Sequence, residues 1–304
     1  MSSEATYYVP EQSKMPILMA LALGVFAFGS GRWMVTGDPT LTLVGVFGIA
    51  VMMYCWFRTV IDENIRGLPD AQLKRSYVWG ISWFIFSEVM FFAGFFGALF
   101  YLRNIAMPWL AGEGAGVNNY LLWPNFVSEW PLLITPDQAV NGDDAKKFIG
   151  AHESLSFPGF SLDKLLHWLP LWNTIILISS SVTVHIAHHH LKHGDNRKKF
   201  NIWLSVTVAL GVIFLGLQIL EYQEAYGHYG LKLTSGIYGT TFFMLTGFHG
   251  FHVAMGTLML GIQLARSFKG HFTAKDHYGF EMASWYWHFV DVVWVMLFFF
   301  VYIF

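Results

Sequence analysis

Charged residues are the scarcest feature of this 304-residue sequence. Lys, Arg, Asp and Glu together make up 12% of it, against roughly 25% in a typical soluble domain. Hydrophobic residues supply 55% and aromatic residues 18%. The formal net charge is -2, which gives no indication of a nucleic acid or other polyanionic partner. This composition predicts a membrane protein.

Cysteine is almost absent. Because Cys55 is the single cysteine, the sequence excludes an internal disulfide, a Cys-x-x-Cys zinc site and covalent haem attachment. A binuclear copper centre, which needs a cluster of Cys with His and Met, is excluded as well. No P-loop or dinucleotide-binding motif occurs, and the first 14 residues lack the basic start of a signal peptide. The first apolar run is therefore expected to be a permanent span.

Seven apolar runs have the length needed to cross a bilayer, which takes roughly 20 residues. They cover about residues 15–34, 41–60, 76–102, 168–190, 200–220, 237–264 and 282–304. The predicted fold class is an all-α membrane protein with seven transmembrane helices. No internal repeat is evident.

The orientation in the membrane is predicted from Lys and Arg in the loops. The even-numbered loops carry Arg66, Lys74, Arg75, Lys192, Arg197, Lys198, Lys199, Arg266, Lys269 and Lys275. Loops one and five offer only Arg32 and Lys232. Since loops rich in Lys and Arg remain in the cytoplasm, we expect a cytoplasmic N-terminus and a periplasmic C-terminus. The third connection, about residues 103–167, is expected outside and partly ordered on the membrane surface.

Two glutamates lie within or directly next to the apolar runs. Glu88 lies near the middle of the third run, where a charge is costly, so it is expected to be protonated at neutral pH. One interpretation of Glu88 is a proton-linked or lipid-lined site, and the other is a protonated, hydrogen-bonded packing residue. Glu221 closes the fifth run after Gln218 and is interpreted as a boundary residue.

Histidines in the sixth and fourth runs allow two interpretations each. His249 and His252 share a helix face, as two metal ligands can, but no third segment completes a ligand set. Neutral histidines that form hydrogen bonds between helices are therefore favoured. The end of the fourth run carries His185, His188, His189, His190 and His193. A metal or haem site is conceivable there, but neighbouring Lys and Arg favour a belt at lipid headgroups.

The last run contains a further ionisable pair. His288 and Asp291 are three residues apart and are neighbours on a helix. Trp287, Asp291 and Trp294 fall on one face. We interpret His288 and Asp291 as a buried hydrogen-bonded pair that fastens the last helix, with the tryptophans as packing and interface anchors.

Several motifs occur in the order and at the spacing of a known family. They are Arg58–Glu63, Ser87–Gly94, Leu171–Thr174, Ala187–His189, Gln218 with Glu221-Tyr222, Gly236–Gly239, Thr246–Val253 and Trp285–Trp294. On these motifs the sequence resembles cytochrome c oxidase subunit III over nearly its whole length.

The resemblance implies a subunit of a haem–copper oxidase that passes electrons from cytochrome c to oxygen and pumps protons. It implies that haem and copper lie in partner subunits and that this chain holds no metal and no catalytic residue. The partners are then subunits I and II, phospholipids, and cytochrome c as donor to the complex. The implied role is to stabilise subunit I and to support proton uptake.

The resemblance also implies an arrangement of the helices and a set of site residues. Residues 1–66 would form a two-helix group and residues 67–304 a five-helix group, around a cleft that holds phospholipids. Glu88 matches the buried carboxylate of the family. The residues expected to contact lipid are Glu63, Arg266, Lys269 and His249.

The third connection is longer than in mitochondrial relatives, which indicates a bacterial plasma membrane. Two alternatives remain open. One is the same subunit in a quinol oxidase, although seven spans favour the cytochrome c type. The other is an independent proton-coupled transporter that uses Glu88 and Asp291; it predicts inverted repeats and broken helices, which the sequence does not indicate.

Overall fold

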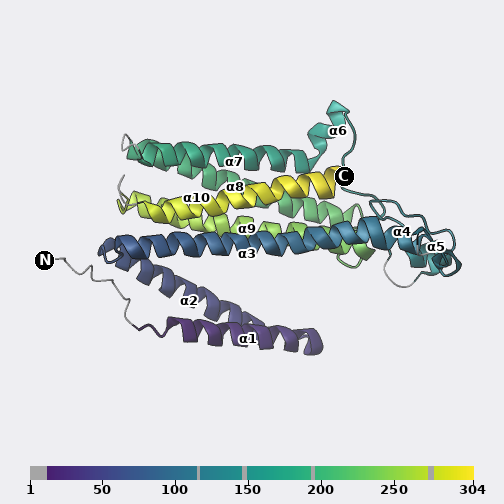
Figure 1. Ribbon diagram of the computed structural model, residues 1–304, viewed down its shortest axis with the longest axis horizontal. Coiled ribbons are helices and arrows are strands. Elements are labelled where there is room, and N and C mark those ends of the chain that lie inside the picture. Colours follow the sequence, from purple (N-terminus) through teal and green to yellow (C-terminus); the bar gives the residue numbers. More distant parts are fainter. Residues whose placement is uncertain (1–11, 115–116, 146–148, 193–195, 273–276) are drawn as a thin grey trace. The chain divides into compact units, whose positions relative to one another are not determined.

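The computed structural model describes residues 12–114, 117–145, 149–192, 196–272 and 277–304. Seven of its helices are long and apolar enough to cross a membrane, which confirms the predicted all-α fold class. They are α1 (Met15–Thr36), α2 (Thr40–Ile65), α3 (Ala71–Tyr101), α7 (Leu169–Lys192), α8 (Arg197–Gly227), α9 (Gly236–Phe268) and α10 (Tyr278–Leu297) (Figure 1).

Two of the spans continue through π-helical turns. α3 passes through Leu102–Ala106 into the short α4 (Met107–Leu110), and α10 passes into Phe298–Ile303. α8 extends beyond its predicted run at both ends, and α10 begins before its predicted run. Backbone hydrogen bonding and tertiary packing, rather than hydropathy alone, decide where a helix begins and stops.

The chain divides by internal packing into two units, Met1–Gly80 and Ile81–Phe304. In the first unit α1 packs against α2 at two glycines. A Cβ atom on Gly29 would lie 2.5 Å from the backbone nitrogen of Thr42, and one on Gly45 would lie 2.5 Å from the Cα of Phe26. Small residues allow this close approach, which is how helices associate in lipid. The grouping of residues 1–66 and 67–304 stays a prediction.

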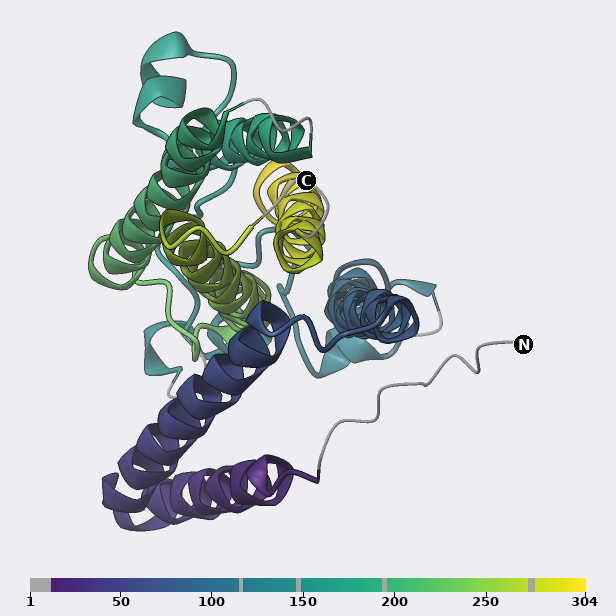
Figure 2. The same cartoon turned by 90° about the vertical axis from the view of Figure 1, so that its left-hand side faces the viewer.

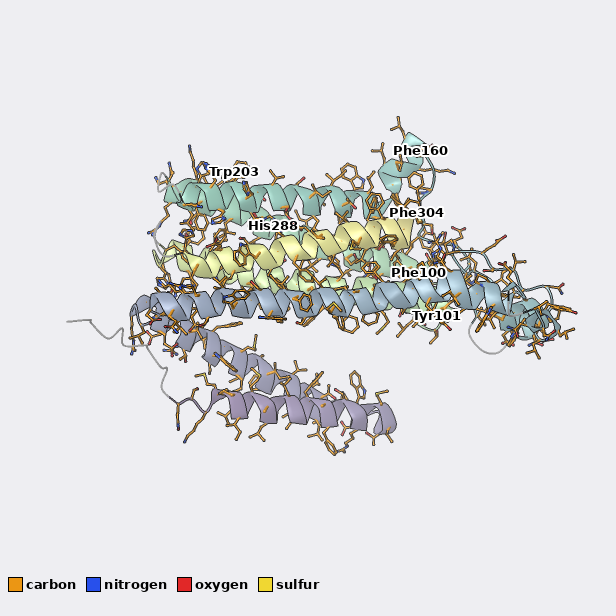
Figure 3. All side chains as sticks on the ribbon, in the orientation of Figure 1. Phe100, Tyr101, Phe160, Trp203, His288 and Phe304 are labelled. Atoms are coloured by element: carbon orange, nitrogen blue, oxygen red, sulfur yellow. The ribbon has the colours of Figure 1, made fainter. Side chains whose placement is uncertain are left out.

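The second unit is built around α10. α10 packs against both α7 and α9, and α8 packs against α7 and α9, as the end-on view in Figure 2 shows. Half of the most apolar window of the last span is buried, against 6% for α1. Outward-facing positions of the unit are also apolar: Phe100 and Phe304 are each 63% exposed (Figure 3). Helices with apolar outer surfaces suit a lipid environment.

Trp287 of α10 is one of the largest fully buried side chains of this unit. Its side chain is fully buried between two glycines: a Cβ on Gly256 of α9 would lie 2.8 Å from Trp287 Cε3, and one on Gly211 of α8 would lie 2.9 Å from its Cη2. Its indole N–H donates to Ser180 Oγ of α7 at 3.0 Å. One side chain therefore joins α10 to α7, α8 and α9.

The third connection packs on the ends of helices in its own unit. Its described residues include α4 and two further short helices, α5 (Pro136–Asn141) and α6 (Leu162–His167). The Phe157 backbone N–H donates to the carbonyl of Tyr302 at 2.7 Å, and Trp168 Nε1 donates to the carbonyl of Leu155 at 3.1 Å. The described parts of this connection are thus ordered, and they cover ends of this chain's own helices.

Candidate functional site

Glu88 of α3 and His252 of α9 form a close carboxyl–imidazole contact. Glu88 Oε2 lies 2.9 Å from His252 Nε2, with side-chain exposures of 20% and 9%. The two residues are 164 positions apart in the sequence. The structure thus brings together one expected site residue, Glu88, and one member of the expected histidine pair.

The second nitrogen of His252 fixes how many protons this contact holds. Nδ1 lies 2.6 Å from the carbonyl oxygen of Phe248. Because a carbonyl oxygen can only accept, Nδ1 carries a hydrogen. Nε2 then either accepts from a protonated Glu88 or, as part of an imidazolium, donates to a carboxylate. In both states one proton lies between Nε2 and Oε2.

The surroundings of this pair are aromatic and aliphatic. A partly open cavity of about 350 Å³ adjoins it. The cavity is lined by Glu88, His252, Phe84, Phe91, Phe248, Phe251, Met255, Met259 and Tyr286. An apolar lining disfavours separated charges more strongly than a neutral hydrogen bond. The neutral form, with the proton on Glu88, is therefore the expected one.

This expectation can be measured by infrared difference spectroscopy on wild type and Glu88→Gln at pH 7. A carboxylic acid C=O band should be present in wild type and absent from the variant. Glu221→Gln serves as a control, because it removes a different buried carboxyl and should leave the Glu88 band in place. A carboxylate band assigned to Glu88 at pH 7 would contradict the neutral form.

His249 lies elsewhere in the bundle. It is fully buried with its ring 5.2 Å from that of Trp294 and 5.8 Å from that of Phe214. Neither ring nitrogen has a hydrogen-bond partner among the described residues. The expected hydrogen bonds between helices are thus present for His252 and are not found for His249. Full burial also leaves His249 no surface for lipid within this unit.

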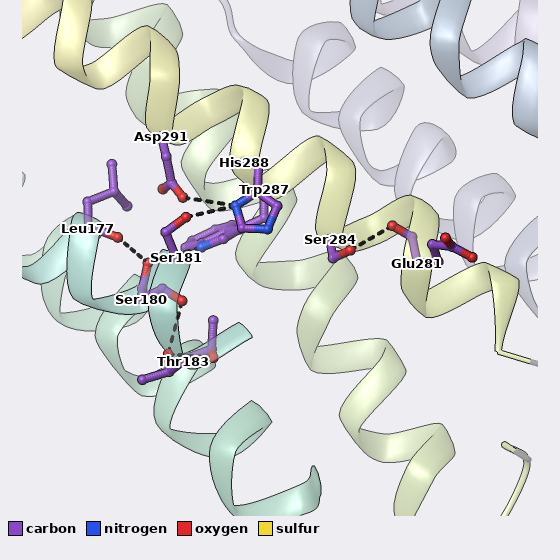
Figure 4. A network of polar contacts seen from close by, with 10 residues as sticks. Leu177, Ser180, Ser181, Thr183, Glu281, Ser284, Trp287, His288 and Asp291 are labelled. Carbon is purple, nitrogen blue, oxygen red and sulfur yellow. Dashed lines mark hydrogen bonds and ion pairs between the residues drawn. The ribbon is translucent and has the colours of Figure 1, made fainter. Parts of the chain in front are cut away.

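The expected hydrogen bond between His288 and Asp291 is not formed, because the two side chains are too far apart. His288 Nδ1 lies 3.8 Å from Asp291 Oδ2, whereas Ser181 Oγ of α7 lies 2.7 Å from the same nitrogen (Figure 4). Trp287, Asp291 and Trp294 are all buried, so the predicted shared face is confirmed. Direct side-chain ties from α10 to α7 come from Trp287, from His288 and from Trp294, whose Nε1 donates to Thr174 Oγ1 at 3.0 Å.

The interpretation of Glu221 as a boundary residue is wrong. Its side chain is fully buried, and Tyr302 Oη donates to Glu221 Oε1 at 2.6 Å. Asn173 Nδ2 lies 3.4 Å from Oε2. The sequence did carry a signal: the buried residues of α8 recur every three or four positions and include Glu221. They are Phe200, Leu204, Thr207, Gly211, Phe214, Gln218, Glu221 and Ala225.

The residues expected near lipid headgroups occupy ends of helices in the two units. Glu63 is half-buried on α2, and Lys269 is exposed at the C-terminal cap of α9. Arg266 is only 8% exposed; it donates to Gln263 Oε1 at 3.1 Å and lies 4.8 Å from the Phe272 ring centroid. Burial, together with the charges of Arg266 and Lys269, lowers the pKa of His271. The positive charge at this end of α9 therefore resides on the arginine and the lysine.

Comparisons with known proteins agree with the motifs in these helices. The family model described as cytochrome c oxidase subunit III matches residues 5–111 and 159–304. The chain is 34% identical to "Cytochrome c oxidase subunit 3" of Oryctolagus cuniculus over 293 residues, or 96% of this chain and 94% of that protein. The same protein of Xenopus laevis is 36% identical, with the same coverage of both chains. Because both matches extend over most of its length, the chain belongs to the cytochrome c oxidase subunit III family.

Proposed function

We propose that this chain is a core subunit of a proton-pumping cytochrome c oxidase, carries no redox centre itself, and stabilises subunit I. The observation that carries the proposal is the match to the subunit III family over nearly the whole chain. Partner subunits I and II would hold haem and copper, and cytochrome c would donate electrons to the complex. Residues 1–66 and 67–304 would act as its two-helix and five-helix groups.

The site of greatest functional interest in this proposal is the Glu88–His252 pair. A carboxyl and an imidazole that hold one proton between them can gain or lose a proton with small movements of the side chains. The pair adjoins a cavity of about 350 Å³ with an apolar lining, which suits a lipid acyl chain. We propose that Glu88 supports proton uptake by the complex from this lipid-lined position.

Purification tests the assignment to an oxidase. A tag on this chain should recover a complex with the absorption spectrum of haem and with oxygen reduction supported by cytochrome c. Recovery of the chain alone, with proton-coupled transport activity in vesicles, would instead support the transporter alternative. A complex that accepts electrons only from quinol, and whose subunit II lacks a copper site, would support the quinol oxidase alternative.

Phospholipid headgroup contact is proposed for Glu63, Arg266 and Lys269. Burial limits what Arg266 can offer, so the contact is expected to depend most on Lys269. We place this end of α9 at the cytoplasmic face of a bacterial plasma membrane, with the N-terminus cytoplasmic. A lysine near an anionic surface contributes about 1 kcal/mol.

Charge reversal tests this contact. Lys269→Glu should lower the phospholipid phosphate that co-purifies with the oxidase and shorten its active lifetime during turnover, because it repels anionic headgroups. Lys232→Glu is the matched control, since Lys232 is an exposed lysine in the loop before α9. Equal lipid content in the two variants would count against the proposed contact.

A further inference from the structure

A second partly open cavity lies between the C-terminal ends of α3 and α10. Its volume is about 490 Å³, and it shares no lining residue with the cavity beside Glu88. Arg103 and Asn104 are its polar side chains, and its wall is otherwise apolar, with Phe96, Leu99, Phe100, Met296, Phe300 and Phe304. We propose that this cavity binds one phospholipid with an anionic headgroup, whose phosphate contacts Arg103 and whose acyl chain lies along the apolar wall.

Both helices that form the cavity contribute residues from a π-helical turn. Arg103 and Asn104 belong to the turn that continues α3, and Phe300 belongs to the turn that continues α10. Such turns are rare and occur frequently at functional sites. The rings of Phe96 and Phe300 are 6.0 Å apart, so side chains from the two helices meet in the cavity wall. Figure 3 shows Phe100 and Phe304 on the ends of these two helices.

Arg103 gives the cavity a positive charge. Its guanidinium carbon lies 5.8 Å from the centre of the Trp130 ring, and it forms no ion pair with a carboxylate among the described residues. A guanidinium stays charged and binds phosphate oxygens through two parallel hydrogen bonds. Asn104 Nδ2 donates to the Phe100 carbonyl at 3.0 Å, which leaves its second N–H for another headgroup oxygen. These donors suit the phosphate of a lipid.

The position of Arg103 along its span corresponds to the level of the headgroups. The helical span Ala71–Leu110 has 40 residues and is about 60 Å long, whereas the hydrocarbon core of a bilayer is about 30 Å thick. Arg103 is the first charged residue after Glu88 in this span, and its long side chain can reach the headgroup region. The apolar residues of α3 that precede it then line the cavity at the depth of the acyl chains.

This site is separate from the headgroup contact proposed at Lys269. The Trp130 ring, which contacts Arg103, also lies 5.5 Å from the ring of Tyr238 at the start of α9. Lys269 caps the other end of α9, which has 33 residues and is therefore about 50 Å long. The two contacts belong to opposite leaflets, and the predicted orientation places Arg103 at the periplasmic one. The proposal does not depend on the oxidase role, because it concerns only lipid held by this chain.

Native mass spectrometry of the purified complex, delipidated with detergent and titrated with phosphatidylglycerol, tests the headgroup contact. Wild type should retain one more phosphatidylglycerol than Arg103→Gln, or bind it about 5-fold more tightly. This factor corresponds to about 1 kcal/mol, the contribution of one basic residue at an anionic lipid surface. Arg32→Gln is the matched control and should behave as wild type, because Arg32 is paired with Asp38 at 3.3 Å. Displacement of the lipid by inorganic phosphate would identify a free-anion site and overturn the lipid assignment.

A cavity-filling substitution tests the acyl-chain contact without changing any charge. Gly97 also lines the cavity, and a Cβ atom on it would have no neighbour within 4 Å. Gly97→Leu should therefore occupy the cavity without a clash inside the chain and lower phosphatidylglycerol binding. Gly94→Leu is the matched control, because Gly94 has the same open space but lies outside the cavity. The haem spectrum of each preparation reports whether the complex has assembled. Binding as tight as in wild type by either Arg103→Gln or Gly97→Leu would overturn the proposal.

Discussion

Trp287→Ala is expected to destabilise the helix bundle by about 3–5 kcal/mol, the range seen when a large buried side chain is truncated. The indole fills the space between Gly211 and Gly256, and the helices around it cannot close fully on an alanine. The substitution also leaves Ser180 without the N–H that donates to its hydroxyl. Thermal or detergent denaturation of the purified complex measures the loss.

The matched control for this prediction is Trp285→Ala. Trp285 lies two positions away on the same helix but is 36% exposed, so its truncation removes less packing and should change stability by roughly 0.5 kcal/mol. Trp287→Phe should fall between the two, since it restores much of the volume without the hydrogen bond. Equal stability of Trp287→Ala and Trp285→Ala would show that Trp287 does not hold the four helices together.

Tyr302→Phe is expected to lower the free energy of unfolding by about 1–3 kcal/mol, because it leaves a buried carboxyl without its closest hydrogen-bond donor. Tyr302 Oη donates to Glu221 Oε1 at 2.6 Å, and the remaining contact, from Asn173 Nδ2, is longer at 3.4 Å. Both Glu221 and Tyr302 are at most 1% exposed. The same denaturation experiment measures this loss.

A double-mutant cycle separates this hydrogen bond from other effects. In a Glu221→Leu background the Tyr302 hydroxyl has lost its acceptor. Tyr302→Phe should then change the stability of the protein little, or even raise it. Tyr226→Phe is the control, because Tyr226 is 47% exposed on the same helix as Glu221 and should tolerate loss of its hydroxyl. If the stability loss of the double variant equals the sum of the losses of Glu221→Leu and Tyr302→Phe, the two groups do not interact energetically.

Glu88 and Glu221 differ in how well the sequence predicts their surroundings. The position of Glu88 in the middle of an apolar run identified it as an unusual residue. Glu221 was misjudged because it closes an apolar run, although its three- or four-residue spacing from other buried positions places it on the packed face of α8. Hydropathy reports how apolar a segment is. Whether a side chain points into the bundle depends on the helix face it occupies and on the helix that packs against that face.

The sequence predicts the surroundings of the histidines only in part as well. The spacing of His249 and His252 places both on one helix face, but it does not distinguish their surroundings. His249 is fully buried with no partner among the described residues, whereas His252 contacts Glu88. His188 stood in a run of similar residues, and only its packing against α10 separates it from them. Local spacing fixes which residues share a helix face, but the partner of each face comes from another helix.

The sequence by itself determined the seven spans, the all-α class and, through its motifs, the family. A helix in lipid must satisfy its own backbone hydrogen bonds, so a sufficiently long apolar run is enough to predict it. Only the tertiary structure decided which polar groups meet. Glu88 with His252 and Glu221 with Tyr302 join residues from distant parts of the chain, and such contacts arise from helix packing that no local pattern specifies.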